Sequence, residues 1–208
     1  ALSRWKKVAA DADPEIRAIA LKLLAEKVPE EAADQIVSQL AFVDYDTQQH
    51  LVEALAKVAR SQGSAFIDRL LPLMASGEAG IRSAVVKILL EMEDRHELVK
   101  RYLKFSKTLA GWARDRALDS MREFGEDLVE PTVELLSDPD EEIRGLALAV
   151  VGAFEDPRII PATVELLGAE DWWLRICAAD TLGQFKDPRA VDALMAALDD
   201  PEARWAAV

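Results

Sequence analysis

The stretch that decides the fold occupies residues 138–158 and reads DPDEEIRGLALAVVGAFEDPR. A related stretch, EDWWLRICAADTLGQFKDPR, occupies residues 170–189, and DDPEARWAAV occupies residues 199–208. A sequence that returns at a fixed interval indicates a repeat protein, in which each copy is one small helical or strand unit stacked on the next. The spacing of the copies therefore gives the length of one unit.

A recurring arginine marks each copy. It follows an apolar residue or alanine and comes about four residues after an acidic residue, and the intervals from Arg82 onward are 32, 30, 31 and 29 residues. The first gap, from Arg17 to Arg82, is 65 residues, which is two intervals. A copy without the arginine must lie between them, in residues 44–59. Its arginine position falls on Gln49 or His50, and the hydrophobic pattern favours Gln49. The marker arginines are Arg17, Arg82, Arg114, Arg144, Arg175 and Arg204.

Each copy is expected to form two helices. Around the marker arginine, apolar or small residues recur at positions −1, +2, +3, +6 and +7, which is one face of a helix and not the alternation of a strand. In the first copy these expected core residues are Ile16, Ile19, Ala20, Leu23 and Leu24. The pattern predicts an all-α fold of about seven helical hairpins in one array over residues 1–208. We number them hairpins 1 to 7, with the bounds 1–27, 28–62, 63–93, 94–125, 126–155, 156–186 and 187–208.

Acidic residues and prolines occupy regular places in the hairpins. The acid ahead of each arginine suits the N-cap of the second helix, because its carboxylate accepts from backbone N–H groups at the positive helix end. Prolines inside the first helices predict a kink in each, since an interior proline costs ~3 kcal/mol of helix stability. The acids are Asp13, Glu78, Asp140, Asp171 and Asp200, and the prolines are Pro72, Pro131 and Pro161.

These arginines, acids and prolines resemble HEAT repeats, in particular the short bacterial and archaeal form called phycobilisome lyase HEAT-like repeats. The resemblance covers nearly the whole chain and is best in residues 126–208, while hairpin 2 lacks the arginine and hairpin 4 has Ala110 at the cap. It implies a right-handed α-α superhelix whose second helices line a concave face. It also implies that the marker arginines and Asp13, Asp140, Asp171 and Asp200 form a side-chain ladder between hairpins.

Composition narrows the classes of protein. Half of the 208 residues are hydrophobic and the formal net charge is −13, which disfavours nucleic acid as a partner. No apolar run approaches the ~18 residues that a membrane helix needs. The single cysteine, Cys177, excludes a disulfide within the chain and favours a reducing compartment such as the cytoplasm. The chain lacks an initiator methionine and ends inside a repeat, so we expect it to be part of a longer polypeptide.

Catalytic and metal-binding patterns are sparse. The HExxH, CxxC, GxGxxG and P-loop motifs are absent. One His-Glu pair, His96–Glu97, is too little for the several pairs by which HEAT-like deoxyhypusine hydroxylases hold two irons. Cys177 falls at position +2, where we expect a buried core residue. We therefore expect no catalytic residue, no metal and no cofactor.

Positions +1, +5 and +8 are expected on the concave face, where hairpins 5 to 7 carry small residues near tryptophans. Aromatic residues on an otherwise acidic surface are typical of a protein-binding site. Two alternatives stay open: a further hairpin covers the last tryptophan, and one of the adjacent pair packs into a turn. The candidate protein-binding residues are Gly145, Ala149, Trp172, Trp173, Ile176 and Trp205.

A basic segment interrupts the acidic chain. Residues 95–122 contain eight basic and three acidic residues, so this segment is a candidate site for an acidic partner or a phosphate-bearing ligand. The alternative is a solvated first helix that pairs with acids of neighbouring hairpins. The candidate residues of this basic patch are Lys100, Arg101, Lys104 and Lys107.

The function predicted from these features is a non-enzymatic scaffold or regulatory module that presents its concave helical face to a protein partner. The repeat type leaves two alternatives, a bilin or chromophore lyase-type protein and a chaperone-like one, and the former needs a groove that holds a tetrapyrrole. The resemblance also extends to HEAT-like alkylpurine DNA glycosylases, which the overall acidity of this chain disfavours.

Overall fold

The structure, a computed structural model, describes residues 2–154 and 156–201. All regular structure in these residues is α-helix or short 3₁₀ helix, and no strand occurs among them. The prediction of an all-α fold built from helical hairpins is therefore confirmed. Arg204 and Trp205 lie outside the described residues.

The chain divides into two compact units, Ala1–Leu98 and Val99–Val208. We call them the N-terminal unit and the C-terminal unit and describe each by itself. The division falls inside α7 (Arg95–Lys107). One array from residue 1 to 208, with a right-handed sense and a concave face, stays a prediction.

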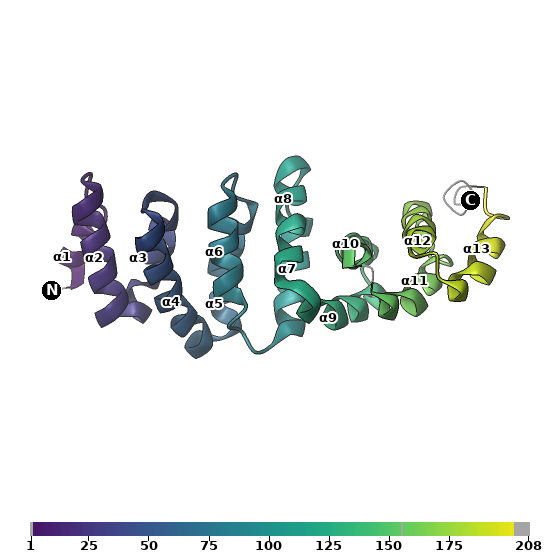
Figure 1. The fold of residues 1–208 in the computed structure, drawn as a ribbon, viewed down its shortest axis with the longest axis horizontal. Helices are drawn as coiled ribbons and strands as arrows, with labels where there is room; N and C mark the ends of the chain where they lie inside the picture. The colour runs from purple at the N-terminus through teal and green to yellow at the C-terminus, as the bar shows by residue number, and fades with distance from the viewer. Residues whose placement is uncertain (1, 155, 202–208) are drawn as a thin grey trace. The chain divides into compact units, whose positions relative to one another are not determined.

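Three hairpins make up the N-terminal unit, which Figure 1 colours from purple to blue. The second helix of each hairpin packs against the second helix of the next, α2 on α4 and α4 on α6. In chain order the helices are α1 (Leu2–Val8), α2 (Pro14–Lys27), α3 (Pro29–Gln39), α4 (Tyr45–Gln62), α5 (Ser64–Leu70) and α6 (Ala79–Leu89).

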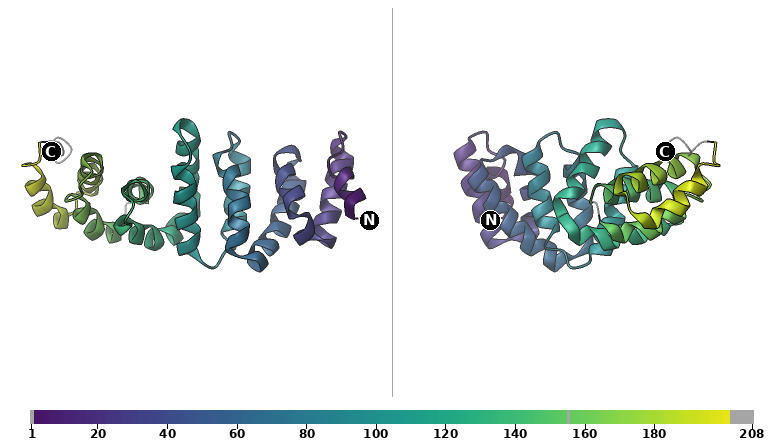
Figure 2. Two further views of the ribbon diagram at one scale, coloured as in Figure 1. Left: turned by 180° about the vertical axis from the view of Figure 1, so that it is seen from behind. Right: turned by 45° about the vertical axis from the view of Figure 1, so that its right-hand side comes forward.

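The C-terminal unit continues with α8 (Gly111–Met121), α9 (Val129–Glu134), α10 (Glu141–Val151), α11 (Ile160–Leu166), α12 (Trp172–Phe185) and α13 (Val191–Ala197). The second helix α10 packs between α8 and α12, and α11 packs on α12. Figure 1 views α10 and α12 end-on above α9 and α11, and the right-hand view of Figure 2 shows the same helices obliquely. Hairpin 4 is joined internally by the buried Tyr102, whose hydroxyl donates to the Ala117 carbonyl of α8 at 2.8 Å.

The three prolines of the first helices lie close to places where α-helix and 3₁₀ helix meet. Each is within three residues of such a junction. Pro72 lies in the 3₁₀ helix η2 (Leu71–Ala75) that follows α5, Pro131 lies in α9 after η3 (Arg122–Leu128), and Pro161 lies in α11 after η6 (Pro157–Ile159). A proline has no N–H to donate, so the α-helical bonding is interrupted at these places. The remaining 3₁₀ helices are η1 (Leu40–Phe42), η4 (Leu135–Ser137), η5 (Gly152–Phe154) and η7 (Pro188–Ala190).

The expected core face is buried in the middle hairpins but not in hairpin 1. In α6 and α10 all five predicted positions are buried, as Ile81 and Ile143 illustrate at position −1. In α2, Ile16 is exposed and Ile19 is 60% exposed, so the prediction that both are core residues is wrong. Within the described residues no second helix precedes α2, and Ile16 therefore lacks the neighbour that covers its equivalents.

The register of hairpin 2 also differs from the prediction. Asp44 caps α4 and accepts from the Thr47 N–H at 2.9 Å, so the position four residues after the cap is Gln48 and not Gln49. The Gln48 side-chain amide donates to the Leu40 carbonyl at 3.0 Å, as the marker arginines do to the carbonyls of their own turns. The error arose because apolar residues follow both glutamines at helical spacing.

Candidate binding groove

The marker arginines close the turns of their own hairpins. The Arg144 guanidinium donates to the Asp138 carbonyl at 2.8 Å and to the Glu141 carboxylate at 2.8 Å. The first contact ties α10 to the turn before it, and the second lies within the first turn of α10. Equivalent bonds, to carbonyls six residues upstream, run from Arg17 to Asp11, from Arg82 to Ser76 and from Arg175 to Ala169.

Some arginines also reach the next hairpin. Arg17 donates to the Phe42 carbonyl at 2.9 Å, and the Arg114 guanidinium lies 3.3 Å from a carboxylate oxygen of Glu142. An Asp–Arg contact of the kind that the resemblance implies joins Arg175 to Asp200 at 2.6 Å.

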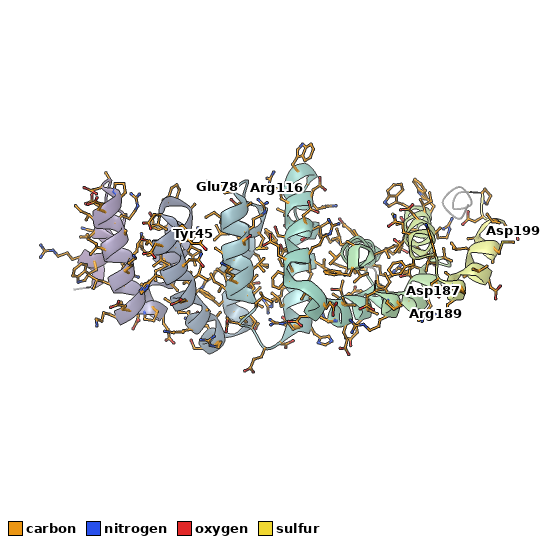
Figure 3. All side chains as sticks on the ribbon, in the orientation of Figure 1. Tyr45, Glu78, Arg116, Asp187, Arg189 and Asp199 are labelled. Carbon is orange, nitrogen blue, oxygen red and sulfur yellow. The ribbon has the colours of Figure 1, made fainter. Side chains whose placement is uncertain are left out.

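The other acids of this column act mainly at helix starts. Asp13, Asp140 and Asp171 accept from backbone N–H groups of the first turns of α2, α10 and α12, at 2.9, 3.0 and 2.7 Å. Glu78, which Figure 3 labels at the start of α6, makes no side-chain bond to that helix start. The arginine and acid columns therefore hold the turns and the helix starts that position the surface between second helices.

A hollow of about 610 Å³ lies between α10 and α12, and we call it the α10–α12 groove. The residues that line it from α10 are Glu141, Glu142, Gly145, Leu146 and Ala149. The residues that line it from α12 and its cap are Asp171, Trp173, Leu174 and Cys177, and Arg114 of α8 completes the lining. The structure thus brings together three of the predicted binding residues, Gly145, Ala149 and Trp173, in one groove.

An exposed indole and small side chains make the groove open. Trp173 is 59% exposed, and its ring meets the ring of Trp172 edge to face with centroids 5.7 Å apart. Trp172 does not line the groove. Opposite, a side chain added at Gly145 would meet no atom within 4 Å of its Cβ. An apolar side chain from elsewhere can therefore enter beside Trp173.

The charge of the groove is negative overall, since three carboxylates and one guanidinium line it. Glu142 is paired with Arg114, and Lys107 also lies 3.5 Å from it. Glu141 is paired with Arg144, yet the side chains of both glutamates remain about two-fifths exposed. A further cation can therefore approach these carboxylates from solvent.

Cys177 is only half-buried and lines the groove, so its prediction as a fully buried core residue is wrong. Burial, followed by the negative charges of Asp180 and Asp171, raises the pKa of the Cys177 thiol. A raised pKa keeps the thiol protonated, which disfavours a nucleophilic role. The described residues also hold no group of three or more His, Cys, Asp or Glu side chains placed to share a metal ion.

The basic patch is divided between exposed and paired residues. Lys100 and Lys104 are exposed and Arg101 is half-buried. Lys107 donates to Asp140 at 2.5 Å, and this hydrogen bond is the main cause that raises the pKa of Lys107. Lys107 therefore connects hairpin 4 to hairpin 5, which is the alternative considered for this segment. Of the other predicted residues, Ile176 is half-buried and does not line the groove.

A second groove, not expected from the sequence, lies between α2 and α4 in the N-terminal unit. This α2–α4 groove has a volume of about 520 Å³ and is lined by Pro14, Glu15, Ala18, Ile19, Lys22, Val43, Asp44 and Thr47. Counted from the arginine position of each hairpin, most lining positions are shared by the two grooves. Position −2 of the second hairpin differs, because Trp173 lines the α10–α12 groove while Asp46 does not line the α2–α4 groove.

Comparison with known proteins supports the architecture. A family model described as HEAT repeats matches residues 129–208, which are most of hairpins 5 to 7. Hairpins 1 to 4 repeat the same two-helix pattern. Residues 129–208 are thus similar to HEAT repeats, and the rest of the chain shares their helical-hairpin architecture. Among the described residues, no helix is both long enough and apolar enough to cross a bilayer. Comparison with curated protein sequences finds no match.

Several solved structures are similar to this chain at low sequence identity and with TM-scores below 0.5. One is a designed armadillo repeat protein in complex with the peptide (KR)4, with 14% identity, coverage of 89% of this chain and 99% of that chain, and a TM-score of 0.36. Another is the complex of CpcE and CpcF of phycocyanin lyase from Nostoc sp. PCC7120, with 17% identity, coverage of 100% and 85%, and a TM-score of 0.37. An engineered protein has 18% identity, coverage of 99% and 93%, and a TM-score of 0.33.

Proposed function

We propose that this chain is a protein-binding scaffold whose C-terminal unit holds a segment of a partner protein in the α10–α12 groove. The observation that carries the proposal is Trp173, a mostly exposed indole beside a groove of about 610 Å³ with small residues at Gly145 and Ala149. Tryptophan is enriched among the residues that dominate binding energy at protein interfaces. An exposed tryptophan at a hollow therefore favours a binding role over a purely structural one.

The rigidity of the groove supports the same role. The N-cap at Asp171 and the turn contacts of Arg144 and Arg175 hold the starts of α10 and α12 in place. A preformed groove loses little conformational freedom when a partner enters, which favours affinity. We place the chain among non-enzymatic regulatory modules of a reducing, cytoplasmic compartment, on the sequence grounds given above.

The proposal is tested by selecting displayed random peptides on the wild-type chain and on a Trp173→Ala variant. We expect peptides that are enriched on the wild type and lost on Trp173→Ala, because the indole supplies much of the contact area. Trp112→Ala is the matched control, since Trp112 is an exposed tryptophan of the same unit outside the groove. Enrichment that is the same on all three proteins would contradict a binding role for the groove.

A pull-down from a native extract separates this proposal from the chromophore alternative. The proposal predicts a captured protein that the wild type retains and Trp173→Ala releases. A visible absorption band from a bound tetrapyrrole, with no protein that depends on Trp173, would favour a lyase-type role instead.

A further inference from the structure

Resting on the proposed function, we infer that the α10–α12 groove selects a basic side chain, lysine or arginine, of the partner segment. The inference names the chemistry of the partner, which the proposed function leaves open. Equivalent positions at the two grooves, each within its own unit, carry different side chains.

The α2–α4 groove contains a cation of its own. Lys22 lines the α2–α4 groove at position +5 of hairpin 1, and its ammonium lies 3.0 Å from the carboxylate of Asp46 in α4, which is outside the groove lining. Asp46 lies at position −2 of hairpin 2, counted from Gln48. In the N-terminal unit, position +5 of hairpin 1 thus holds a cation, and position −2 of hairpin 2 holds its acceptor.

The α10–α12 groove lacks that internal lysine and has an aromatic acceptor. Position +5 of hairpin 5 is Ala149, and position −2 of hairpin 6 is Trp173. An indole face attracts a cation through its quadrupole and is the best of the aromatic side chains at doing so. The α10–α12 groove therefore has no long side chain where the Lys22 stem lies in the α2–α4 groove. The indole ring of Trp173 lies beside this open place and can bind an ammonium group.

A second lysine that joins two second helices in the N-terminal unit is also missing at the equivalent position of the C-terminal unit. Between hairpins 2 and 3, Lys87 at position +5 donates to the Gln49 side chain at position +1, at 3.1 Å. Between hairpins 5 and 6 these positions hold Asp180 and Gly145. The two lysines that bridge second helices in the N-terminal unit are replaced by an alanine and an acid in the C-terminal unit.

The carboxylates of the groove complement an incoming cation. Glu142 already has Arg114 and Lys107 as partners, and Glu141 has Arg144, so the main acceptor for a further cation is Asp171. Asp171 uses Oδ1 to accept from the Leu174 N–H, and an ionised carboxylate has about four acceptor sites on its two oxygens.

The apolar part of a basic side chain also has a place. Lysine and arginine bury their methylene stems on apolar surface while the charged head remains near water or acids. Leu146 and the Trp173 ring offer that surface in the groove. The overall net charge of −13 adds a weaker, non-directional attraction, which the test must separate from the groove itself.

The probe is a fluorescein-labelled peptide of four serine–lysine repeats, and its match carries acetyl groups on every lysine Nζ. Binding is followed by fluorescence anisotropy at about 150 mM salt, where diffuse attraction is screened beyond ~8 Å. We expect the lysine peptide to bind the wild type at least about tenfold more tightly than the acetylated peptide, because acetylation removes the charge.

Two variants locate the site. Ala149→Lys supplies an internal cation as Lys22 does, and Trp173→Ala removes the indole, so each should weaken binding of the lysine peptide by about tenfold or more. Ala153→Lys is the matched control, because it adds the same charge at an exposed residue of η5 outside the groove. Helicity from circular dichroism should be the same in all of them.

Cys177 gives a readout that does not depend on the label. It is the single cysteine of the chain and it lines the groove. Its alkylation by iodoacetamide, followed by mass, should slow when the lysine peptide is bound and should be unchanged by the acetylated peptide.

Three outcomes would overturn the inference. Equal loss of binding in Ala153→Lys and Ala149→Lys would show diffuse attraction to an acidic chain. Equal affinity for the acetylated peptide would show a groove that holds a protein segment without a cation, and the proposed function would then stand alone. Absence of binding by the lysine peptide would remove the inference, while the display selection would still decide the proposed function.

Discussion

The α2–α4 groove and the α10–α12 groove occupy the same place in the repeat but carry different side chains at two equivalent positions. In the first, Lys22 lines the groove and pairs with Asp46 of α4, and in the second, the equivalent positions hold Ala149 and Trp173. Both grooves lie between the second helices of successive hairpins. Positions +5 and −2 form an ion pair in the N-terminal unit, whereas Ala149 and Trp173 cannot form one in the C-terminal unit, where we propose that a partner enters.

The largest expected difference concerns the turn contact beside each groove. Arg144 bonds a carbonyl and a carboxylate from a mostly buried position, whereas Gln48 bonds one carbonyl. We expect Arg144→Ala to lower the free energy of unfolding by about 1–3 kcal/mol and Gln48→Ala by about 0.5–1.5 kcal/mol. Urea denaturation followed by circular dichroism measures both. Equal losses would mean that the two turns are held equally, against the contacts described.

The helix caps are the next test, and here the two grooves should behave alike. Asp44 and Asp171 each accept from the first turn of the second helix that borders a groove, at 2.9 and 2.7 Å. Asp44→Ala and Asp171→Ala should each lower the free energy of unfolding by about 0.5–2 kcal/mol. Replacement by asparagine, which retains a capping oxygen, should restore most of the loss. A large effect at one cap alone would show that the grooves are not equivalent.

Low pH should reduce the stability of hairpins 6 and 7 through an aspartate–arginine pair at the start of each first helix. Hairpins 1 to 3 lack this Asp-Pro-Arg sequence. Asp156 and Asp187 each pair with the arginine two residues later, and Figure 3 labels Asp187 and Arg189 side by side. Hydrogen bonds from the Arg189 side chain, and then from its backbone N–H, lower the pKa of Asp187 to about 2. A lowered pKa in the folded state contributes stability above about pH 4, and this contribution is lost as the pH falls through about 2.

The pH dependence is measured as the melting temperature between pH 6 and pH 2. We expect little change above about pH 4 and a fall below it, and Asp187→Asn should reduce the steepness of that fall. A double variant with Asp156→Asn should reduce it further, because its pKa is lowered by Arg158 in the same way. A fall of unchanged steepness in the double variant would assign the acid sensitivity to other carboxyl groups.

The smallest expected effect is that of the bridge itself. The side chains of Lys22 and Asp46 are 35% and 91% exposed, so solvent screens their attraction. A double-mutant cycle with Lys22→Ala and Asp46→Ala should give a coupling energy below about 0.5 kcal/mol. A coupling above about 1 kcal/mol would show that the bridge stabilises the fold, and the two grooves would then differ in stability as well as in access.

Much of the architecture is predictable from local pattern. The arginine interval of about 31 residues, the apolar face around each arginine and the caps Asp13, Asp140 and Asp171 each depend on residues a few turns apart. Such short-range features predict the helices and the hairpins, because helical period and capping act within one helix. The predicted register of hairpin 2 failed because the apolar spacing favours Gln49, whereas the cap at Asp44 and the bond to the Leu40 carbonyl place Gln48 at the arginine position.

The candidate site was only partly predictable. The spacing placed Gly145, Ala149 and Trp173 on one surface, but it could not show that Trp173 lines a hollow while Trp172 and Ile176 do not. It also could not show that Cys177 is half-buried or that Lys107 bonds Asp140. These contacts and exposures depend on the distance between helices of different hairpins. The sequence of one repeat contains no information about that distance.

By itself, the sequence determined that this protein is all-α and built of helical hairpins, with arginines and acids at the turns. Period, apolar face and caps are properties of one hairpin, and the repeat copies them along the chain. Only the tertiary structure decided which groove is bridged and which is open. A groove exists only between hairpins, and whether Lys22 reaches Asp46, or Ala149 leaves room beside Trp173, depends on how two helices pack together.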